Sequence, residues 1–238
     1  MMRIAAVGDV HLAEDARGQL RPALEKLRER ADVLLLAGDL TRHGTLEEAH
    51  VVADEFCDLG VPVIAVLGNH DYHSDAAEEI TVLLESREIT VLEGTAATLT
   101  VDGQTLGVAG VKGFGGGFAG KCASVFGERQ MKDFAEYTIR VADRLREALS
   151  GLDTEIRVAL THYAPIKDTL SGEPREVYPF LGSYLLGEPI DEFAVDLALH
   201  GHAHAGCERG TTPGGVRVRN VAQPVIHSAY VVYGIRSN

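Results

Sequence analysis

The sequence predicts an α/β fold in which two packed β-sheets are enclosed by layers of helices. Five short apolar runs, rich in β-branched and aliphatic residues, indicate buried strands. Patterns typical of amphipathic helices fill the gaps between the first of these runs, as a layered sheet requires. The chain of 238 residues is long enough for one sizeable core, so a single domain over residues 1–238 is expected.

The early helices are predicted from periodicity and from their end signals. Residues 19–31 are expected to form one helix, because Leu20, Leu24, Leu27 and Ala31 share a helical face. Thr45 and Glu48 resemble a capping box that starts a second helix, and Gly60 is expected to close that segment. A third helix is expected to begin near Ser74.

The second half of the chain carries a hairpin, a long helix and further strands. The runs ATLTV and QTLGVAGV flank Asp102 and Gly103, which predicts a β-hairpin with its turn at these two residues. A long helix is expected from about Glu128 to Ser150, before Gly151. The runs GVRVRNV and AYVVYGI continue the chain as strands, which gives about nine strands in total.

Each of the five buried runs is followed at once by side chains that can bind a metal. The runs stand before GDVH, GDL, GNHD, THY and HGHAH. In layered α/β proteins, ligands bind in the crevice outside the carboxyl ends of the strands, so the five clusters are expected to share one crevice. The groups that they offer are Asp9, His11, Asp39, Asn69, His70, His162, His202 and His204.

This set of side chains favours a site for two metal ions. Carboxylate, amide oxygen and imidazole without thiolate suit manganese, iron or zinc. Eight groups are too many for one ion that leaves a position open for substrate, so two divalent ions are expected, with Asp39 as a bridging carboxylate. In an extended segment His200, His202 and His204 leave the backbone on the same side.

Composition excludes several other classes of protein. No apolar run approaches the roughly 18 residues of a membrane span, and a candidate functional residue already at position 9 leaves no room for a signal peptide. The three cysteines lie far apart, which argues against a disulfide framework and favours the cytoplasm. A net charge of −13 makes nucleic acid an unlikely partner, although metal ions can reverse the field within one pocket.

Taken in order, DVH, GDL, GNHD, a lone histidine and GHAH resemble the signature of the calcineurin-like metallophosphoesterases over residues 9–204. The resemblance implies a four-layer αββα sandwich, with two mixed β-sheets flanked by helices, and a two-metal site. One metal would be held by Asp9, His11, Asp39 and His204, and the second by Asp39, Asn69, His162 and His202.

The same resemblance assigns roles to residues around these ligands. His70 would not be a ligand but would sit beside the phosphate and help to protonate the leaving group, while Asp71 would be structural. His200 is expected to lie outside the ligand set. Many members carry an aspartate three residues after the bridging Asp39 to orient the catalytic histidine, whereas this chain has Arg42. Arg42 either binds a phosphate oxygen, together with Asn69, or is a solvated loop residue.

The implied reaction is hydrolysis of a phosphate ester by a metal-activated water. The forms DVHL, GDLTRHG and GNHD are closer to bacterial cyclic-nucleotide phosphodiesterase-like members than to protein serine/threonine phosphatases. The expected partner is therefore a small phosphate ester, such as a nucleotide, and not a membrane. The alternatives are a phosphomonoesterase, a small DNA or RNA nuclease of the same superfamily, and a scaffold that binds partners without catalysis.

The glycine-rich segment 113–120 has a competing interpretation. Residues 115–121 match the GxxxxGK form of a phosphate-binding loop, but Cys122 stands where such a loop needs Ser or Thr. A flexible loop at the rim of the site is therefore preferred.

Overall fold

The computed structural model describes residues 1–236, which form two large β-sheets packed face to face. The first sheet has the order β13-β1-β2-β3-β4, with strands β13 (Val231–Ile235), β1 (Met2–Val7), β2 (Val33–Ala37), β3 (Val63–Val66) and β4 (Ile89–Val91). The second has the order β11-β12-β10-β9-β6-β5, with strands β11 (Arg209–Thr211), β12 (Arg217–Asn220), β10 (Leu197–His200), β9 (Ile156–Thr161), β6 (Gln104–Val111) and β5 (Thr95–Val101).

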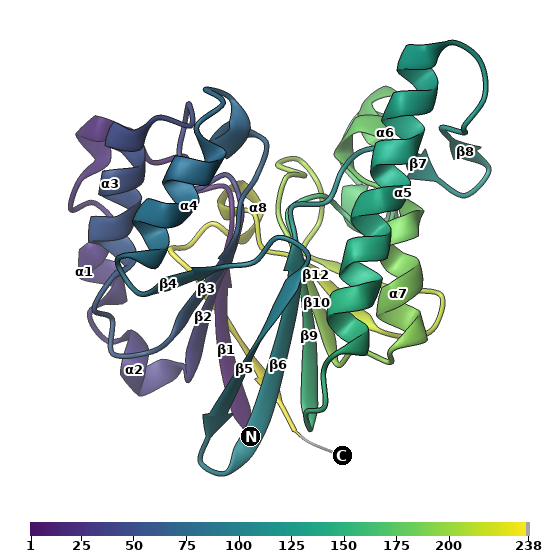
Figure 1. Cartoon of the computed structure of the whole chain (residues 1–238). Helices are drawn as coiled ribbons and strands as arrows, with labels where there is room; N and C mark the ends of the chain where they lie inside the picture. The colour runs from purple at the N-terminus through teal and green to yellow at the C-terminus, as the bar shows by residue number, and fades with distance from the viewer. Residues whose placement is uncertain (237–238) are drawn as a thin grey trace.

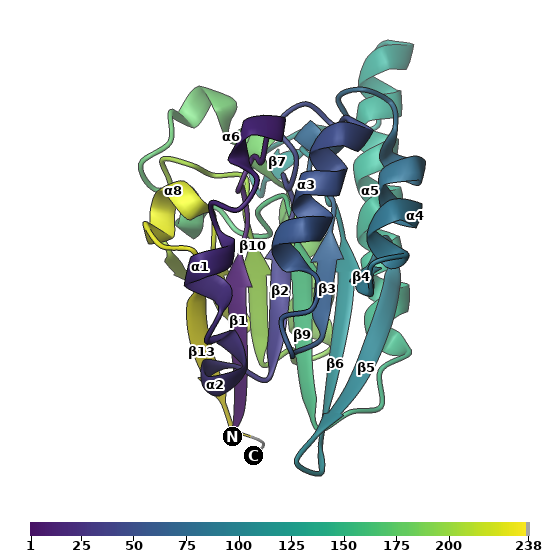
Figure 2. The same cartoon turned by 90° about the vertical axis from the view of Figure 1, so that its left-hand side faces the viewer.

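Helices cover the outer face of each sheet, as Figures 1 and 2 show. The first sheet is covered by α1 (Arg21–Leu24), α2 (Leu27–Arg30), α3 (Leu46–Phe56) and α4 (Ala77–Glu85). The second is covered by α5 (Arg129–Ser150) and α7 (Gly187–Glu192). Short helices α6 (Tyr178–Leu181) and α8 (Gln223–Ile226) and a small hairpin of β7 (Gly117–Phe118) and β8 (Lys121–Cys122) lie among the connections. The predicted four-layer αββα arrangement with two mixed sheets is confirmed.

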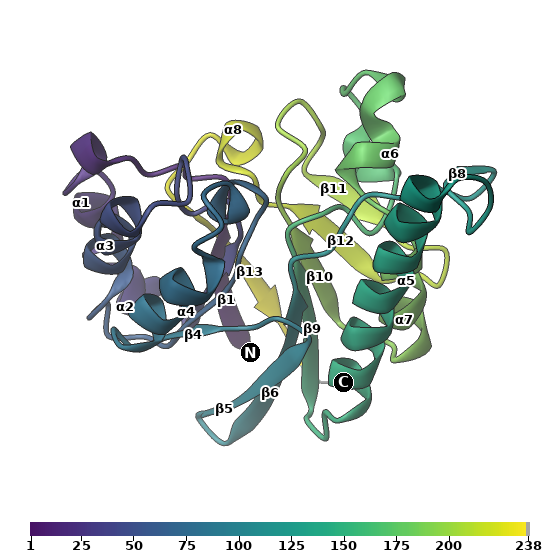
Figure 3. The same ribbon diagram turned by 45° about the horizontal axis from the view of Figure 1, so that its top comes forward.

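Parallel pairing in the middle of each sheet aligns the strand ends that carry the motifs. Strands β1, β2 and β3 are parallel neighbours, as are β6, β9 and β10, while β13, β5 and β11 are antiparallel at the edges. Because the middle strands run the same way, their carboxyl ends emerge at one end of the molecule, which comes forward in Figure 3.

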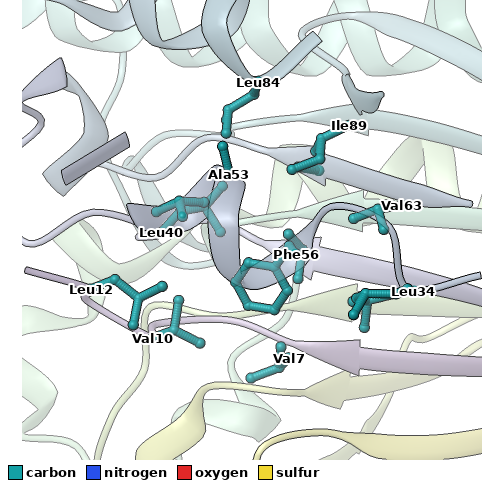
Figure 4. Close-up of a cluster of buried hydrophobic side chains, with 14 of the residues drawn as sticks. Val7, Val10, Leu12, Leu34, Leu40, Ala53, Phe56, Val63, Leu84 and Ile89 are labelled. Carbon is teal, nitrogen blue, oxygen red and sulfur yellow. The ribbon is translucent and has the colours of Figure 1, made fainter. Parts of the chain in front are cut away.

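The core explains why the buried strands read as continuous apolar runs. In β2, Leu34 and Leu36 face helices α3 and α4, while Val33 and Leu35 face the second sheet. Both faces of the strand are therefore covered, and alternation with polar residues is lost. Figure 4 shows the helix-facing cluster, in which Phe56 of α3 lies above the sheet.

The first predicted helix is wrong in one respect, because residues 19–31 form two short helices instead of one. Lys26 leaves the helical conformation at φ −103° and ψ 16° and separates α1 from α2. The start of α1 is fixed from outside the segment, since the buried carboxylate of Glu55 accepts hydrogen bonds from the backbone N–H groups of Leu20 (3.0 Å) and Arg21 (2.7 Å). Short helices of this kind depend on such tertiary contacts.

The second and third predicted helices are present, but their ends differ from the predicted ones. The Thr45 hydroxyl accepts from the backbone N–H of Glu48 at 3.2 Å, but α3 ends at Phe56 instead of near Gly60. The Glu48 carboxylate does not complete the capping box and instead accepts from the backbone N–H of His43 at 2.6 Å. Helix α4 begins at Ala77, three residues after the predicted start at Ser74.

The long helix and the hairpin are confirmed. Helix α5 spans Arg129–Ser150, and Gly151 caps its C-terminal end. The turn between β5 and β6 places Asp102 at φ 49° and Gly103 at φ 80°, the conformations that a tight hairpin turn requires at both central positions.

Candidate metal centre

The loops after β1, β2, β3, β9 and β10 meet at the carboxyl ends of the two sheets. The backbone joins the first two directly, since Asp9 N–H donates to the Gly38 carbonyl at 2.9 Å and His11 N–H donates to the Asp39 carbonyl at 3.0 Å. The fifth loop joins the first through the His202 backbone N–H, which lies 2.9 Å from Asp9 Oδ2. The motifs therefore come together at one place, where their candidate ligand atoms gather.

Four of the predicted ligands occupy an unusual backbone conformation. Asp9, His11, Asp39 and His202 have φ values of 57°, 43°, 51° and 70°. Positive φ is uncommon for residues other than glycine, and such residues gather at functional sites where the surroundings enforce the strain. In this protein the residues with positive φ lie in the turns that follow β1, β2 and β10.

The side chains form two clusters that share Asp39, and within each cluster the candidate ligand atoms all lie within 4.8 Å of one another. The first cluster consists of Asp9, His11, Asp39 and His204, and the second of Asp39, His162 and His202. Asn69 joins the second cluster, because its Oδ1 lies 3.0 Å from His162 Nε2. The structure thus brings together all seven residues predicted to be ligands.

Two motif glycines allow the clusters to close. A Cβ on Gly68 would collide with Asp39 Oδ1, and a Cβ on Gly201 would collide with Asp9 Oδ2. The glycine of GNHD thus makes room for the shared carboxylate, and the glycine of GHAH makes room for Asp9.

The histidine rings are held so that their electron pairs face the clusters. His162 is fully buried, and its Nδ1 must donate to the Ala37 carbonyl at 2.9 Å, since a carbonyl oxygen only accepts. Burial keeps the pKa of His162 well below its usual value, so the ring is neutral. Its Nε2 electron pair therefore points at Asn69 Oδ1 and at Asp39 Oδ1, the latter 3.3 Å away.

Burial also favours the neutral form of His202 and His11. His202 Nε2 donates to the Phe180 carbonyl at 3.2 Å, which leaves Nδ1 free, and burial lowers the pKa of His202 to about 3. Burial also lowers the pKa of His11 to about 4, and its Nε2 lies 3.5 Å from His204 Nε2. Neutral imidazoles are the form that binds metals.

The donor set fits metal ions because its two carboxylates are buried together; His204 Nε2 lies 2.8 Å from Asp9 Oδ1, and this hydrogen bond raises the pKa of His204. Asp9 and Asp39 are only 2% and 1% exposed. Over residues 1–236, neither carboxylate forms an ion pair with a lysine or arginine. Burial raises the pKa of Asp9 to about 6. Electron-pair donors that face each other in this way repel unless a cation lies between them.

His70 lies beside the first cluster with its ring half exposed. Its Nδ1 donates to the Arg42 carbonyl at 2.6 Å, and its ring meets the His11 ring edge to face at 4.5 Å. Nε2 stays 4.0 Å from Asp39 Oδ2. The backbone carbonyl of Arg42 thus holds the His70 ring, although residue 42 is not an aspartate.

Two neighbours of the ligands have structural roles. Asp71 is fully buried and accepts from the backbone N–H groups of Thr41 (2.8 Å) and Gly68 (2.7 Å), which joins the second and third motifs. His200 is fully buried, donates from Nδ1 to the Gly201 carbonyl at 2.7 Å and has Nε2 2.8 Å from the Thr169 hydroxyl. These contacts place His200 outside both clusters, as expected.

Arg42 points its guanidinium into solvent. The residue is exposed, and its charge contributes to the lowered pKa of His11 after burial and other neighbours. Within residues 1–236 no hydrogen bond or ion pair engages the guanidinium. It is therefore available to an anion near the first cluster.

Sequence reasoning missed Lys112, which directly follows β6 and whose carbonyl accepts from the backbone N–H of His162 at 2.9 Å. Val111 pairs with Thr161, so the following residues are neighbours across the two strands. Lys112 is 5% exposed, and its Nζ lies 5.0 Å from the Tyr72 ring centre and 5.3 Å from that of Tyr163. It stands at a strand end like the other site residues, which is the signal that could have revealed it.

In the glycine-rich segment, two backbone N–H groups that a phosphate-binding loop would offer to phosphate are engaged within the protein. Gly116 N–H donates to the Pro179 carbonyl at 2.7 Å, and Gly117 N–H donates to the Gly182 carbonyl at 2.9 Å. Strand β8 begins at Lys121, the last residue of the GxxxxGK match, where a phosphate-binding loop would lead into a helix. The segment supports α6.

A sequence profile of calcineurin-like phosphoesterases matches residues 2–206. The chain belongs to this family. The match confirms the family predicted from the five motifs.

Curated relatives share shorter segments with the chain. A protein of Caenorhabditis elegans that is named as a metallophosphoesterase is 34% identical over 111 residues, which cover 45% of this chain and 23% of that protein. A protein of Synechococcus that is named as a cyclic nucleotide phosphodiesterase is 35% identical over 80 residues, or 29% of this chain and 31% of that protein. The matched parts thus span less than a third of either relative.

Solved structures support the fold. A phosphopantetheinyl hydrolase of Mycobacterium tuberculosis superposes with a TM-score of 0.66 at 14% identity, covering 92% of this chain and 88% of that one. A protein of Thermus thermophilus superposes with a TM-score of 0.54 at 17% identity, covering 99% of each chain. Among residues 1–236, no helix has the length and apolar character needed to cross a membrane.

Proposed function

We propose that the chain hydrolyses phosphate esters at a centre of two divalent metal ions. The observation that carries the proposal is the pair of clusters that share the buried Asp39. The first ion would be held by Asp9, His11, Asp39 and His204, and the second by Asp39, Asn69, His162 and His202. When bound, such ions supply Lewis acidity and lower the pKa of the attacking water.

The residues of the chain supply the remaining parts of the reaction. His70 is the proposed proton donor to the leaving group, because Nδ1 is engaged by the Arg42 carbonyl and Nε2 faces the first cluster. The Arg42 guanidinium and the Asn69 side chain are the proposed contacts of the phosphate oxygens. A guanidinium suits this role because its planar array of donors matches phosphate geometry.

The proposed substrates are phosphodiesters such as cyclic nucleotides. The motif forms support this class, and so does the similarity to the cyanobacterial protein named as a cyclic nucleotide phosphodiesterase. The net charge of −13 weighs against a nuclease. Manganese and iron are the proposed metals, with zinc as an alternative, since the donors are oxygen and imidazole nitrogen.

Two further proposals concern the whole chain. Residues 1–238 are proposed to form one domain, which the apolar cluster shared by the two sheets supports. A cytoplasmic location is supported by the three cysteines, all of which are free thiols.

A hydrolysis screen tests the proposed function. The manganese-loaded protein is offered cyclic nucleotides, nucleotide monoesters, single-stranded DNA and a phosphopeptide, with and without a chelator. Cyclic nucleotides and activated diesters are expected to react fastest, and chelation is expected to stop the reaction. Preference for DNA would favour the nuclease, preference for monoesters would favour the phosphomonoesterase, and no hydrolysis of any ester would favour the scaffold.

A further inference from the structure

The helix α6 carries an exposed phenylalanine next to the second cluster. Phe180 is the third residue of this four-residue helix, and its carbonyl accepts the hydrogen bond from His202 Nε2 at 3.2 Å. The backbone of Phe180 is therefore hydrogen-bonded directly to a residue of the candidate metal centre.

The Phe180 ring is left out of the core, unlike the rings and aliphatic groups beside it. Tyr178 and Leu181 pack against the small apolar cluster that contains Phe118 and Leu170. Phe180 belongs to none of the buried clusters and is 62% exposed. A large apolar ring exposed beside a polar site is available to bind a ligand.

The backbone that carries this ring is fixed from two sides. Gly116 N–H donates to the Pro179 carbonyl at 2.7 Å and Gly117 N–H donates to the Gly182 carbonyl at 2.9 Å. Ala164 N–H donates to the Leu181 carbonyl at 3.0 Å. The glycine-rich segment and the loop after His162 thus hold α6 in place, so that the backbone under the ring needs little ordering when a ligand binds.

We propose that Phe180 is a stacking platform for a planar aromatic group of the substrate. The inference rests on the proposed phosphoesterase function and narrows its substrate to phosphate esters that carry a nucleobase. With the phosphate at the metal centre, the base would lie on the second-cluster side, above α6. A base stacked on an aromatic ring typically gains enough binding free energy to change affinity by about 5- to 150-fold.

The test compares two substrates that differ in their aromatic content. Cyclic AMP carries a base, whereas glycerophosphocholine is a phosphodiester without a ring. Phe180→Ala is expected to raise KM for cyclic AMP by about 5- to 150-fold and to leave kcat/KM for glycerophosphocholine unchanged. Phe180→Tyr should restore the wild-type KM, because it keeps a ring at this position.

A second phenylalanine provides a matched control. Phe126 is 82% exposed in the loop between β8 and α5, and Phe126→Ala is expected to change neither KM. Equal effects of Phe180→Ala on both substrates, or equal effects of the two alanine variants on cyclic AMP, would overturn the stacking role. Metal content should match wild type in both variants, since only the backbone carbonyl of Phe180 meets His202.

Binding of AMP, measured by calorimetry on the manganese-loaded protein, tests the platform independently of turnover. Weaker AMP binding in Phe180→Ala than in Phe126→Ala supports the platform, and no AMP binding to the wild-type protein contradicts it. If the wild-type protein hydrolyses glycerophosphocholine but not cyclic AMP, the platform is wrong while the phosphoesterase proposal stands. If it binds AMP through Phe180 but hydrolyses no phosphate ester, the proposed function is wrong while the platform stands.

Discussion

His70 Nδ1 donates to the backbone carbonyl of Arg42 at 2.6 Å. The carbonyl fixes the ring without a carboxylate, so a change of the Arg42 side chain leaves this hydrogen bond in place. The roles of His70 and Arg42 can therefore be separated by mutation.

His70→Ala is expected to keep both metal ions and to lose about 10²–10⁴-fold in turnover, the range of a positioned acid–base group. A nitrophenolate departs without much help from a proton, whereas the alkoxide of a ribose needs one. The loss should therefore be far larger on a cyclic nucleotide than on a nitrophenyl ester, measured as kcat on each. Equal losses would assign His70 to phosphate positioning, and loss of metal would make it a ligand. His50→Ala, on the exposed face of α3, is the control.

Arg42→Ala is expected to raise KM by about 10- to 100-fold, because a charge-assisted hydrogen bond to phosphate is lost. The preference of the enzyme between leaving groups should stay as in wild type, since the carbonyl that holds His70 is retained. Steady-state kinetics on both ester types provide the measurement, with the exposed Arg30→Ala of α2 as control. Unchanged kinetics would make Arg42 a solvated loop residue.

Asp39→Ala is expected to lose more metal than Asp9→Ala, because only Asp39 belongs to both clusters. The two variants are well matched, because both carboxylates are buried and each accepts one backbone N–H group. Asp39 accepts from His70, and Asp9 accepts from His202. Elemental analysis of the folded variants should find less than one ion in Asp39→Ala and about one in Asp9→Ala. Equal losses would argue against a bridging carboxylate.

Arg3 and Asp32 form an ion pair at the amino ends of β1 and β2, away from the metal centre. We expect this pair to make part of the stability of the protein depend on pH in the acid range. Burial tends to raise the pKa of Asp32, but hydrogen bonds from Arg3, one of them 2.6 Å long, outweigh it and lower that pKa. The stabilisation is therefore present above the unfolded pKa of about 4 and is lost as pH falls through the lower folded value.

Asp32→Asn should accordingly lower Tm by about 1–4 °C at pH 7, and this difference should shrink below about pH 4. Thermal unfolding followed by circular dichroism from pH 7 to pH 3 provides the measurement. The exposed Asp153→Asn is the control. A difference that stays constant down to pH 3 would exclude the linkage.

Much of the fold and of the site could be predicted because the signals are local. Leu34 and Leu36 alternate with Val33 and Leu35 on a strand buried on both faces, and such a run reads as a strand without knowledge of its neighbours. Asp39 follows that run directly, so parallel pairing of the strands is enough to bring it to the shared edge.

The features that could not be predicted depend on contacts between distant residues. The break between α1 and α2 accompanies capping by Glu55, more than thirty residues away in the chain. The orientation of His70 uses a carbonyl, which any residue type offers, so no sequence pattern marks it. Phe180 lies next to His202 because the glycine-rich segment and the loop after His162 both hold α6 in place.

The metal content of the purified protein tests the central claim most directly. Elemental analysis under saturating manganese, combined with hydrolysis assays before and after chelation, gives the number of ions that activity requires. Two clusters that share Asp39 predict two ions per chain, complete loss of hydrolysis on chelation and recovery when metal is restored. Full activity with at most one ion per chain would contradict the two-metal centre.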